Sequence, residues 1–337
     1  MSSKSITRKI QLTGGSTYIV SLPKEWIKAL SLRNGDEVEI VQDKDMRLVI
    51  VPKVNNTRDQ NELRKILNCE KISAEAIIRE FIAHYMAGYS SVIFSCPKMT
   101  TSVRMLIKDE IRRRLLGAEV VEEDANTISI QFLVDEKELP IKKAMSRAFT
   151  ISFNMLRDSL ESIRLADIEL AKEIAGRDDE VDRFFFYIAR QLTLSVNMLS
   201  ILESEGYNIA QLVDIYSVAK VIERVADHAD RIATLAEDVS KFSKKDELTN
   251  LGYNILDTYK TSMNAFLNGK KDVSHDLISN INIFKQLAEM QESAIKSNDS
   301  PKIVTSTSMV IESLRRIARY SSDIAEATID MLAKSGK

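Results

Sequence analysis

The first fifty residues alternate between apolar and polar positions with a period of two, which is typical of short β-strands. The alternation is interrupted at Gly14-Gly15 and stops at Pro23, two signals that are characteristic of turns. A short stretch with helical spacing follows the proline, and two more alternating stretches come later. We therefore expect the order β-β-α-β-β, with strands near 10–12, 18–22, 38–41 and 46–51 and a helix at 24–32.

Residues 55–60 are polar and without pattern, so we interpret them as a linker to a second domain. Beyond this linker, Ser73 is a suitable N-cap for one helix and Thr100 or Thr101 for a second, because their hydroxyl oxygens can accept from free backbone amides. Gly88 and Gly117 are suitable helix ends. We expect a small α/β domain with helices at 73–88 and 100–116 and strands at 91–96, 119–122 and 127–134.

From Pro140 onward, apolar residues recur every three or four positions, which predicts long helices. Three such stretches, at 141–164, 167–202 and 211–240, precede a polar break at 241–245. The pattern then restarts at 248–267, 273–297 and 301–332, so the chain contains an internal repeat. The predicted fold is multi-domain and mainly α, with a β domain at 1–54, a small α/β domain at 62–137, and three-helix bundles at 139–241 and 246–333.

The composition changes this picture little. The 337 residues are 44% hydrophobic and 28% charged with a net charge of −2, which excludes a polyanion-binding surface over the whole molecule. No apolar run approaches the roughly 18 residues of a membrane helix, and the N-terminus lacks a signal-peptide core. Cys69 and Cys96 are too few for a disulfide framework. We expect a cytoplasmic protein that is not integral to a membrane.

The sequence contains none of the common catalytic arrangements. It has no Ser/His/Asp or Cys/His set, no phosphate-binding glycine-rich loop and no HExxH motif, and its three histidines lie on separate predicted helices. We therefore do not expect an enzyme.

An acidic stripe stands out on the third helix of the first predicted bundle. Glu223, Asp227 and Asp230 are spaced i, i+4 and i+7, so they share one face, opposite the apolar side that contains Val225. Like charges at i, i+4 destabilise a helix by roughly 0.2–0.5 kcal/mol per pair. Solvent, neighbouring arginines or a bound cation must neutralise them. A solvated helix face and a metal site are both compatible with this spacing.

A second acidic pair favours the metal site. Asp178 and Asp182, also at i, i+4, precede the stripe by one predicted helix hairpin, and antiparallel packing would bring the two sets together. Oxygen-only ligands favour hard cations over thiolate-type zinc. The predicted site holds one or more metal ions through Asp178, Asp182, Glu223, Asp227 and Asp230, with iron, manganese, magnesium, calcium and zinc not distinguished.

The two acidic motifs resemble those of a known protein family. The stretch Glu223-Arg-Val-Ala-Asp227-His-Ala is similar to the Glu-Arg-Ile-x-Asp-His-Ala signature of the PhoU family of phosphate-signalling proteins, and Asp178-x-x-x-Asp182 resembles the other acidic motif of that family. The resemblance implies tandem three-helix bundles that bind metal clusters through these motifs.

The second repeat departs from that pattern. Arg315 and Arg319 stand where Glu223 and Asp227 would be expected, and Asn280 replaces the second acid four residues after Asp276. We therefore expect one metal site, in the first bundle only. Arginine side chains can grip phosphates or carboxylates, so Arg315, Arg316 and Arg319 are candidate contacts for an anion or an acidic partner; a solvated face is the alternative.

The N-terminal segment resembles a second family. Ser21-Leu-Pro-Lys-Glu-Trp26, followed by Leu32-x-x-Gly35-Asp36, is similar to the AbrB/SpoVT swapped-hairpin domain of DNA-binding regulators and antitoxins, which implies a homodimer. So small a sheet also buries too little surface to be stable alone. Candidate DNA-phosphate contacts are Arg8, Lys9, Lys24 and Lys28, and dimerisation without DNA binding is the alternative.

The whole-chain order is similar to that of archaeal PhoU-like phosphate-uptake regulators. This resemblance implies a DNA-binding transcriptional regulator of phosphate uptake whose bundles bind metal and sense phosphate status. The alternative is an adaptor that dimerises through its N-terminal domain and restrains a phosphate transporter ATPase or a sensor kinase without binding DNA.

Overall fold

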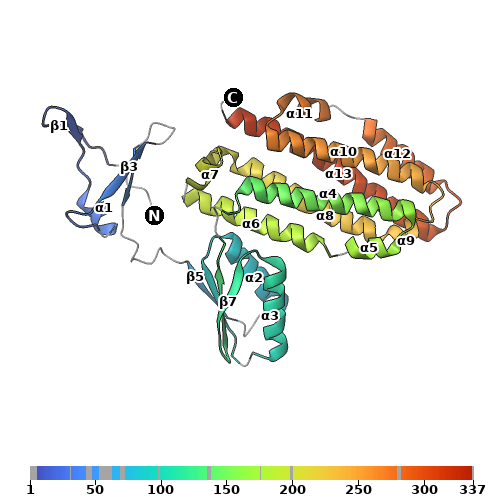
Figure 1. Ribbon diagram of the computed structural model, residues 1–337, viewed down its shortest axis with the longest axis horizontal. Helices are drawn as coiled ribbons and strands as arrows, with labels where there is room; N and C mark the ends of the chain where they lie inside the picture. Colours follow the sequence, from blue (N-terminus) through green and yellow to red (C-terminus); the bar gives the residue numbers. More distant parts are fainter. Residues whose placement is uncertain are drawn as a thin grey trace. The chain divides into compact units, whose positions relative to one another are not determined.

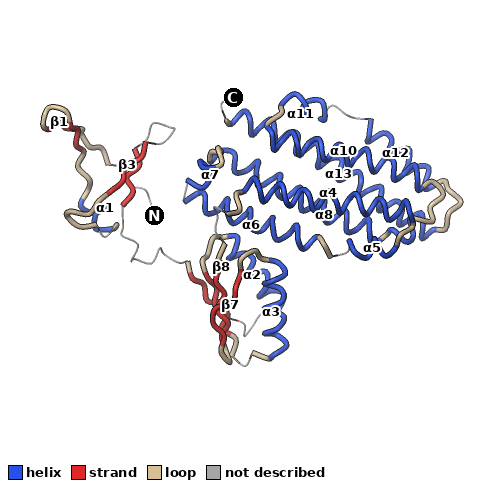
Figure 2. The backbone as a smooth tube through the Cα atoms, viewed as in Figure 1, coloured by secondary structure: helices blue, strands red, loops and turns tan. Residues whose placement is uncertain are grey.

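The protein divides into two units, residues 1–62 and 63–337. The computed structural model describes residues 6–30, 32–42, 48–52, 63–68, 73–97, 99–134, 138–174, 176–197, 200–278 and 282–335. The predicted linker at 55–60, Cys69 and Asn280 lie outside the described residues. Figures 1 and 2 show the mainly helical architecture, with two small β regions before the helices, as the sequence predicted.

The N-terminal unit has the predicted order β-β-α-β-β. Strand β1 (Gln11–Thr13) pairs antiparallel with β2 (Thr17–Ile19), helix α1 (Lys24–Ala29) follows, and β3 (Val38–Gln42) pairs antiparallel with β4 (Leu48–Pro52). The two hairpins form separate two-stranded sheets. Among the residues of this unit whose side chains the structure describes, only Pro23 is buried, and Tyr18 and Leu48 are 71% and 69% exposed. In a single copy, the described part of this unit therefore forms no hydrophobic core.

The second unit begins with a four-stranded sheet in the order β5-β6-β8-β7. Its elements are β5 (Arg64–Asn68), α2 (Ala74–Met86), β6 (Ser91–Ser95), α3 (Thr101–Arg114), β7 (Ala118–Glu123) and β8 (Thr127–Phe132). Strand β5 runs parallel to β6, and the other pairs are antiparallel. The side chains of Ser73 and Thr100 cap α2 and α3 as expected. The pattern did not predict β5, because Leu67 is the only residue that this edge strand buries.

The remaining chain is helical. The described helices are α4 (Ile141–Leu165), α5 (Ile168–Ile174), α6 (Asp178–Asn197), α7 (Ser200–Ser204), the 3-10 helix η1 (Ile209–Gln211), α8 (Leu212–Thr234), α9 (Ala236–Val239), α10 (Lys245–Asn268), α11 (Lys271–Ile278), α12 (Asn282–Ile295) and α13 (Pro301–Lys334). The single helix predicted at 167–202 is wrong, because a turn at Gly176 and Arg177 separates α5 from α6. Gly176, before α6, has a φ of 84°, which other residues rarely adopt.

The two helical repeats share one hydrophobic core. Buried side chains from α4 and α8 are continuous with those from α10 and α13. Helices α4 and α10 approach closely at Gly252, where an added Cβ atom would lie 2.5 Å from a Leu160 methyl carbon. The end of α13 is fixed to the start of α8, because Lys334 donates to both oxygens of the buried Asp214 at 2.7 and 2.8 Å. The repeats therefore form one packed body.

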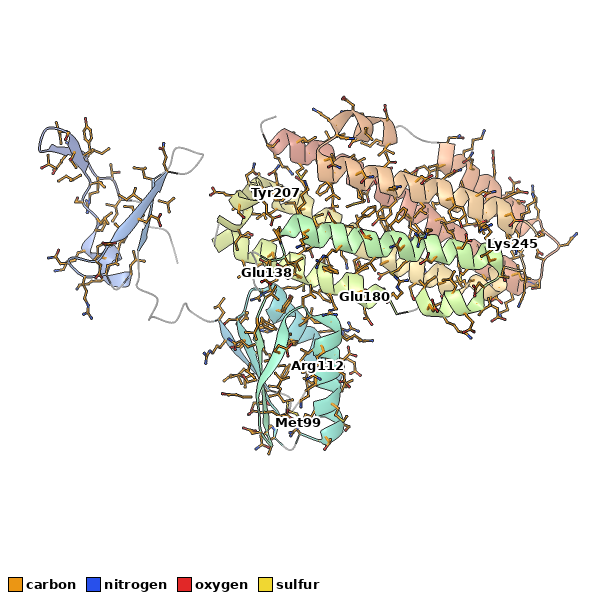
Figure 3. All side chains as sticks on the ribbon, in the orientation of Figure 1. Met99, Arg112, Glu138, Glu180, Tyr207 and Lys245 are labelled. Atoms are coloured by element: carbon orange, nitrogen blue, oxygen red, sulfur yellow. The ribbon has the colours of Figure 1, made fainter. Side chains whose placement is uncertain are left out.

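Helix α6 joins this body to the sheet domain, which lies beside it in Figure 1. The buried guanidinium of Arg190 donates to the backbone carbonyls of Tyr85 and Tyr89, at 2.8 and 2.7 Å. Phe186 contacts the cores of both regions. Helix α3 also contacts α6; Figure 3 labels Arg112 on α3 and Glu180 on α6. Within the described residues, no helix is both long and apolar enough to cross a membrane.

Candidate metal centre

Helices α6 and α8 pack antiparallel. Phe185 on α6 lies against Tyr216 near the start of α8, whereas Asp182, one turn earlier on α6, lies by Glu223 and Asp227 further along α8. The apolar residues predicted for one face of α8, including Val225 and Ala229, are fully buried in the shared core. This burial fixes the rotation of α8, so that its acidic stripe faces the first turns of α6.

Three of the predicted ligands converge. Asp182, Glu223 and Asp227 each offer one carboxylate oxygen, and these oxygens lie within 4.8 Å of one another. Asp182 and Glu223 are half-buried, while Asp227 stands at the open side of the cluster. We call these three residues the acidic cluster.

Burial and mutual repulsion make it costly to ionise the acidic cluster. Burial, reinforced by the charges of Glu223, Asp227 and Asp178, raises the pKa of Asp182 to about 7. Burial and the neighbouring carboxylates also raise the pKa of Asp227 to about 6. One carboxylate oxygen of Glu223, Oε2, is buried and has no hydrogen-bond partner among the described residues. A buried acceptor without a donor costs free energy, and a cation bound to this oxygen would reduce that cost.

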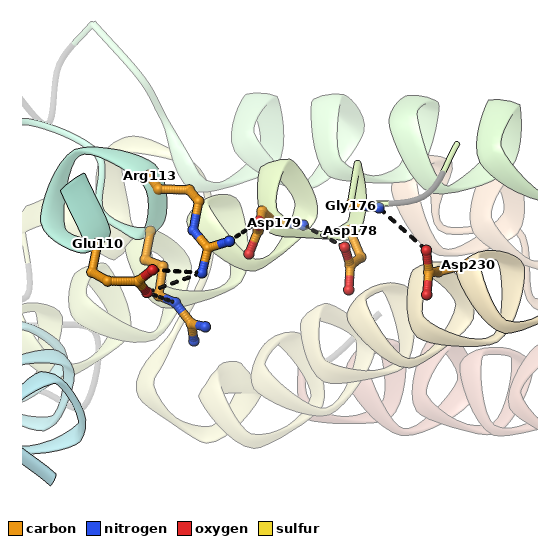
Figure 4. Close-up of polar contacts among 7 residues, drawn as sticks. Glu110, Arg113, Gly176, Asp178, Asp179 and Asp230 are labelled. Carbon is orange, nitrogen blue, oxygen red and sulfur yellow. Dashed lines mark hydrogen bonds and ion pairs between the residues drawn. The ribbon is translucent and has the colours of Figure 1, made fainter. Parts of the chain in front are cut away.

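The other two predicted ligands lie nearby but make other contacts. Asp230 Oδ1 accepts from the backbone amide of Gly176 at 3.2 Å, and Asp178 Oδ1 accepts from the amide of Asp179 at 3.0 Å (Figure 4). Both charges still act on the cluster, because Asp178 raises the pKa of Asp182 and Asp230 raises that of Asp227. The structure therefore brings three of the five predicted residues within ligand distance of each other and places two beside them.

Arg113 of the sheet domain pairs with Asp179, next to Asp178 in the first turn of α6 (Figure 4). The Arg113 guanidinium pairs with Asp179 at 3.1 Å and with Glu110 of its own helix at 2.8 Å. A role for this arginine was not predicted, because nothing in the sequence indicates that α3 packs beside α6.

One further residue at the site was missed by the sequence analysis. The Lys220 ammonium lies 2.5 Å from Glu223 Oε1 and 4.7 Å from the centre of the Phe185 ring. Its position one turn before Glu223, on the same stripe of α8, was visible in the sequence.

The donor set fits a hard cation. All converging atoms are carboxylate oxygens from two facing helices, and Glu223, which supplies one of them, also has a buried oxygen without a partner among the described residues. Asp182, Glu223 and Asp227 are the residues that would hold a metal ion.

Comparisons with known proteins agree with the two-part organisation of the chain. Residues 145–236, which contain the acidic cluster, match the PhoU domain family, and residues 11–58 match the family described as antidote-toxin recognition MazE, a bacterial antitoxin. The chain is PhoU-like, with an AbrB-like N-terminal domain. No curated protein matches it significantly by sequence.

Solved PhoU structures share the fold. PhoU from Pseudomonas aeruginosa superposes with a TM-score of 0.52 at 16% identity, over 59% of this chain and 98% of that one. The phosphate transport system regulatory protein PhoU from Streptococcus pneumoniae gives a TM-score of 0.51 at 16% identity, over 59% of this chain and 95% of that one. At such identities the likeness establishes the fold alone.

The arginines of the second PhoU-like repeat lie on α13. Arg315 and Arg316 both pair with Glu312, at 2.8 and 3.2 Å, whereas Arg319 has no ion pair with a described residue. Arginines of α8 come close to the same helix: the Arg224 guanidinium lies 5.8 Å from the centre of the Tyr320 ring. We call the partly exposed strip along the two helices the basic seam. It comprises Arg224, His228 and Arg231 of α8 and Glu312, Arg315, Arg316, Arg319, Tyr320 and Asp323 of α13.

The basic seam is electropositive. Five arginines face two carboxylates, and His228 is held neutral, because burial, followed by Arg316 and Arg231, lowers its pKa to about 4. The sequence had indicated only the α13 arginines; the contribution of α8 depends on the packing of the two repeats.

The candidate DNA contacts lie in the N-terminal unit. Arg8, Lys9, Lys24 and Lys28 are all exposed, and the last two stand one turn apart on α1. Their charges are therefore free to meet a polyanion.

Proposed function

We propose that this PhoU-like protein is a regulator of phosphate homeostasis that binds a divalent cation through Asp182, Glu223 and Asp227. The PhoU domain match and the PhoU fold support the regulatory class. The observation that carries the metal proposal is the buried, unpartnered Glu223 oxygen between two carboxyl groups whose pKa values are raised. A bound cation would offset the repulsion of the cluster and cross-link α6 to α8.

Metal titration of the intact protein tests this proposal. We expect one Mn²⁺ or Mg²⁺ site per chain by calorimetry, weakened at least tenfold by Asp227→Asn, whose isosteric amide keeps the shape of the site but removes a charge. Asp257→Asn is the matched control, because Asp257 is an exposed acid on α10 away from the cluster. Unchanged affinity in D227N would refute the assignment, and a second equivalent site would refute the prediction that only the first repeat binds metal.

We further propose that the N-terminal unit forms a homodimer and binds DNA through Arg8, Lys9, Lys24 and Lys28. The exposed apolar faces of both hairpins support dimerisation, because a second copy would cover surface that a single copy leaves in water. The similarity to a MazE antitoxin domain and the exposed cations of α1 support contact with DNA phosphates.

Binding of the full-length protein to genomic DNA fragments across a salt series tests the DNA proposal. We expect affinity to fall steeply as salt increases and to be lost in the double variant Lys24→Glu/Lys28→Glu. Light scattering of the same variant must still show a dimer, since the exchanged residues are exposed and charged. Salt-independent binding, or binding that the double variant retains, would contradict it.

The basic seam favours a second candidate function, that of an adaptor. Its arginines extend along two helices rather than around a pocket, which suits an acidic protein surface such as one on a transporter ATPase or a sensor kinase. In that case the N-terminal unit only dimerises the protein. Absence of DNA binding by an intact dimer, together with a partner whose binding Arg316→Glu/Arg319→Glu abolishes, would favour the adaptor.

A further inference from the structure

Lys220 already supplies a positive charge to the acidic cluster. Its ammonium contacts Glu223 Oε1 at 2.5 Å, and among the described residues it is the one cation that pairs with a cluster carboxylate. The cluster is thus partly neutralised without any metal.

The position of Lys220 allows its ammonium group to move away from Glu223. The Lys220 side chain is 33% exposed whereas that of Glu223 is 12% exposed, so the ammonium reaches the cluster from its solvent side. In the same position the ammonium lies 4.7 Å from the centre of the Phe185 ring, so part of its stabilisation comes from a contact that does not involve the carboxylates. The long, flexible stem allows the head group to move without shifting α8.

Lys220 neutralises the cluster incompletely. It engages Oε1 of Glu223 and leaves Oε2 buried without a partner. One positive charge also faces three carboxyl groups, whereas a divalent ion would bring two and could contact several oxygens at once. The ammonium and the metal therefore compete for the same carboxylate, and the metal satisfies the site better.

We propose that Lys220 is the internal counter-cation of the metal-free cluster, and that a divalent cation binds by displacing its ammonium from Glu223. This proposal rests on the proposed metal-binding function. Metal binding is then an exchange of one cation for another. Without metal, Lys220 reduces the repulsion among the three carboxylates, and because it must be displaced it lowers the apparent metal affinity. When metal binds, the Lys220 ammonium moves to the surface of α8.

The first test compares metal affinities. In Lys220→Met the apolar stem is kept and the competing charge removed, so we expect Mn²⁺ to bind roughly tenfold more tightly, equivalent to about 1.4 kcal/mol. Lys220→Arg retains a cation and should stay near the wild-type affinity. Lys260→Met is the matched control, because Lys260 lies near Phe153 but pairs with no described carboxylate.

The second test needs no variant. Amine labelling of the wild-type protein, followed by peptide mass spectrometry, should show Lys220 modified severalfold faster when Mn²⁺ is added, while Lys260 stays unchanged. Lysine reactivity reports the release of the ammonium directly, and it remains informative if Lys220→Met fails to fold without metal.

The outcomes distinguish the proposed displacement of Lys220 from the proposed metal site on which it rests. If the wild-type protein binds Mn²⁺, but Lys220→Met does not tighten binding and labelling of Lys220 does not change, displacement is refuted while the metal site stands. If only Lys220→Met binds Mn²⁺, Lys220 is a permanent occupant and both exchange and metal binding by the natural protein are refuted. If neither protein binds Mn²⁺ or Mg²⁺, the metal site itself falls.

Discussion

Asp182→Asn should stabilise the metal-free protein while destroying its response to metal. The isosteric amide removes one of the three clustered charges and adds an N–H group near the buried, unpartnered Glu223 oxygen. The rise in the pKa of Asp182 from 3.8 to about 7 corresponds to an upper limit of about 4 kcal/mol at neutral pH. Because the carboxyl is only half-buried and titrates together with Asp227, solvent screening reduces the expected gain to roughly 1–2 kcal/mol.

Chemical denaturation and thermal unfolding in the presence of a chelator measure this gain. For a body of this size, each kcal/mol corresponds to about 2–4 °C in the midpoint. Added Mn²⁺ should raise the midpoint of the wild-type protein and of the control Asp257→Asn, but not that of Asp182→Asn. A metal-free D182N protein less stable than wild type would refute the reasoning, since it would mean that the Asp182 carboxylate stabilises the fold.

Three further predictions concern pH, packing and the domain junction. The folded pKa values of Asp182 and Asp227, about 7 and about 6, lie above their ordinary 3.8, so these two carboxyl groups should lower metal-free stability as pH rises from about 4 to 7. His228, whose pKa is lowered to about 4, changes stability in the opposite direction, so the carboxyl contribution is measured as the difference in unfolding free energy between Asp182→Asn and the wild type at each pH. This difference should grow from pH 4 to 7, and Mn²⁺ affinity measured by calorimetry should rise through pH 6–7 as protons leave; a difference that shrinks over this range would contradict the sign. Gly252→Ala should lower the free energy of unfolding, measured with denaturant, by about 1–3 kcal/mol, because the added Cβ would lie 2.5 Å from a Leu160 methyl carbon. In Gly206→Ala the added Cβ has no atom within 4 Å, so this variant measures only the effect of the positive φ. Arg190→Met leaves the carbonyls of Tyr85 and Tyr89 without their guanidinium donor and should lower the free energy of unfolding by about 1–3 kcal/mol. Amide hydrogen exchange should become faster in α2. Equal protection in the variant and the wild type would show that the junction does not depend on Arg190.

Much of the fold followed from local pattern. The β-β-α-β-β order of the N-terminal unit, the caps at Ser73 and Thr100 and the long helices α4, α8 and α13 were expected, because alternation, capping and the 3.6-residue period are properties of short stretches. Strand β5 was missed because an edge strand that buries only Leu67 has almost no pattern. The turn before α6 was missed because the apolar spacing continues through it.

The candidate site shows the same division. Helical periodicity alone placed Glu223, Asp227 and Asp230 on one stripe of α8 and Asp178 and Asp182 on one stripe of α6. Tertiary packing decided which of them meet: the buried face of α8 turns Glu223 and Asp227 toward Asp182, while the Gly176 amide engages Asp230.

Packing also brought together residues that no local pattern connects. Lys220 meets Phe185 across two helices, Arg113 reaches Asp179 from another domain, and Arg224 reaches Tyr320 from the other repeat. The sequence by itself determined which side chains share a helix face, because that depends only on the rise and twist of one helix. The tertiary structure alone decided which faces meet, because that depends on how all the apolar stripes are buried together in one core.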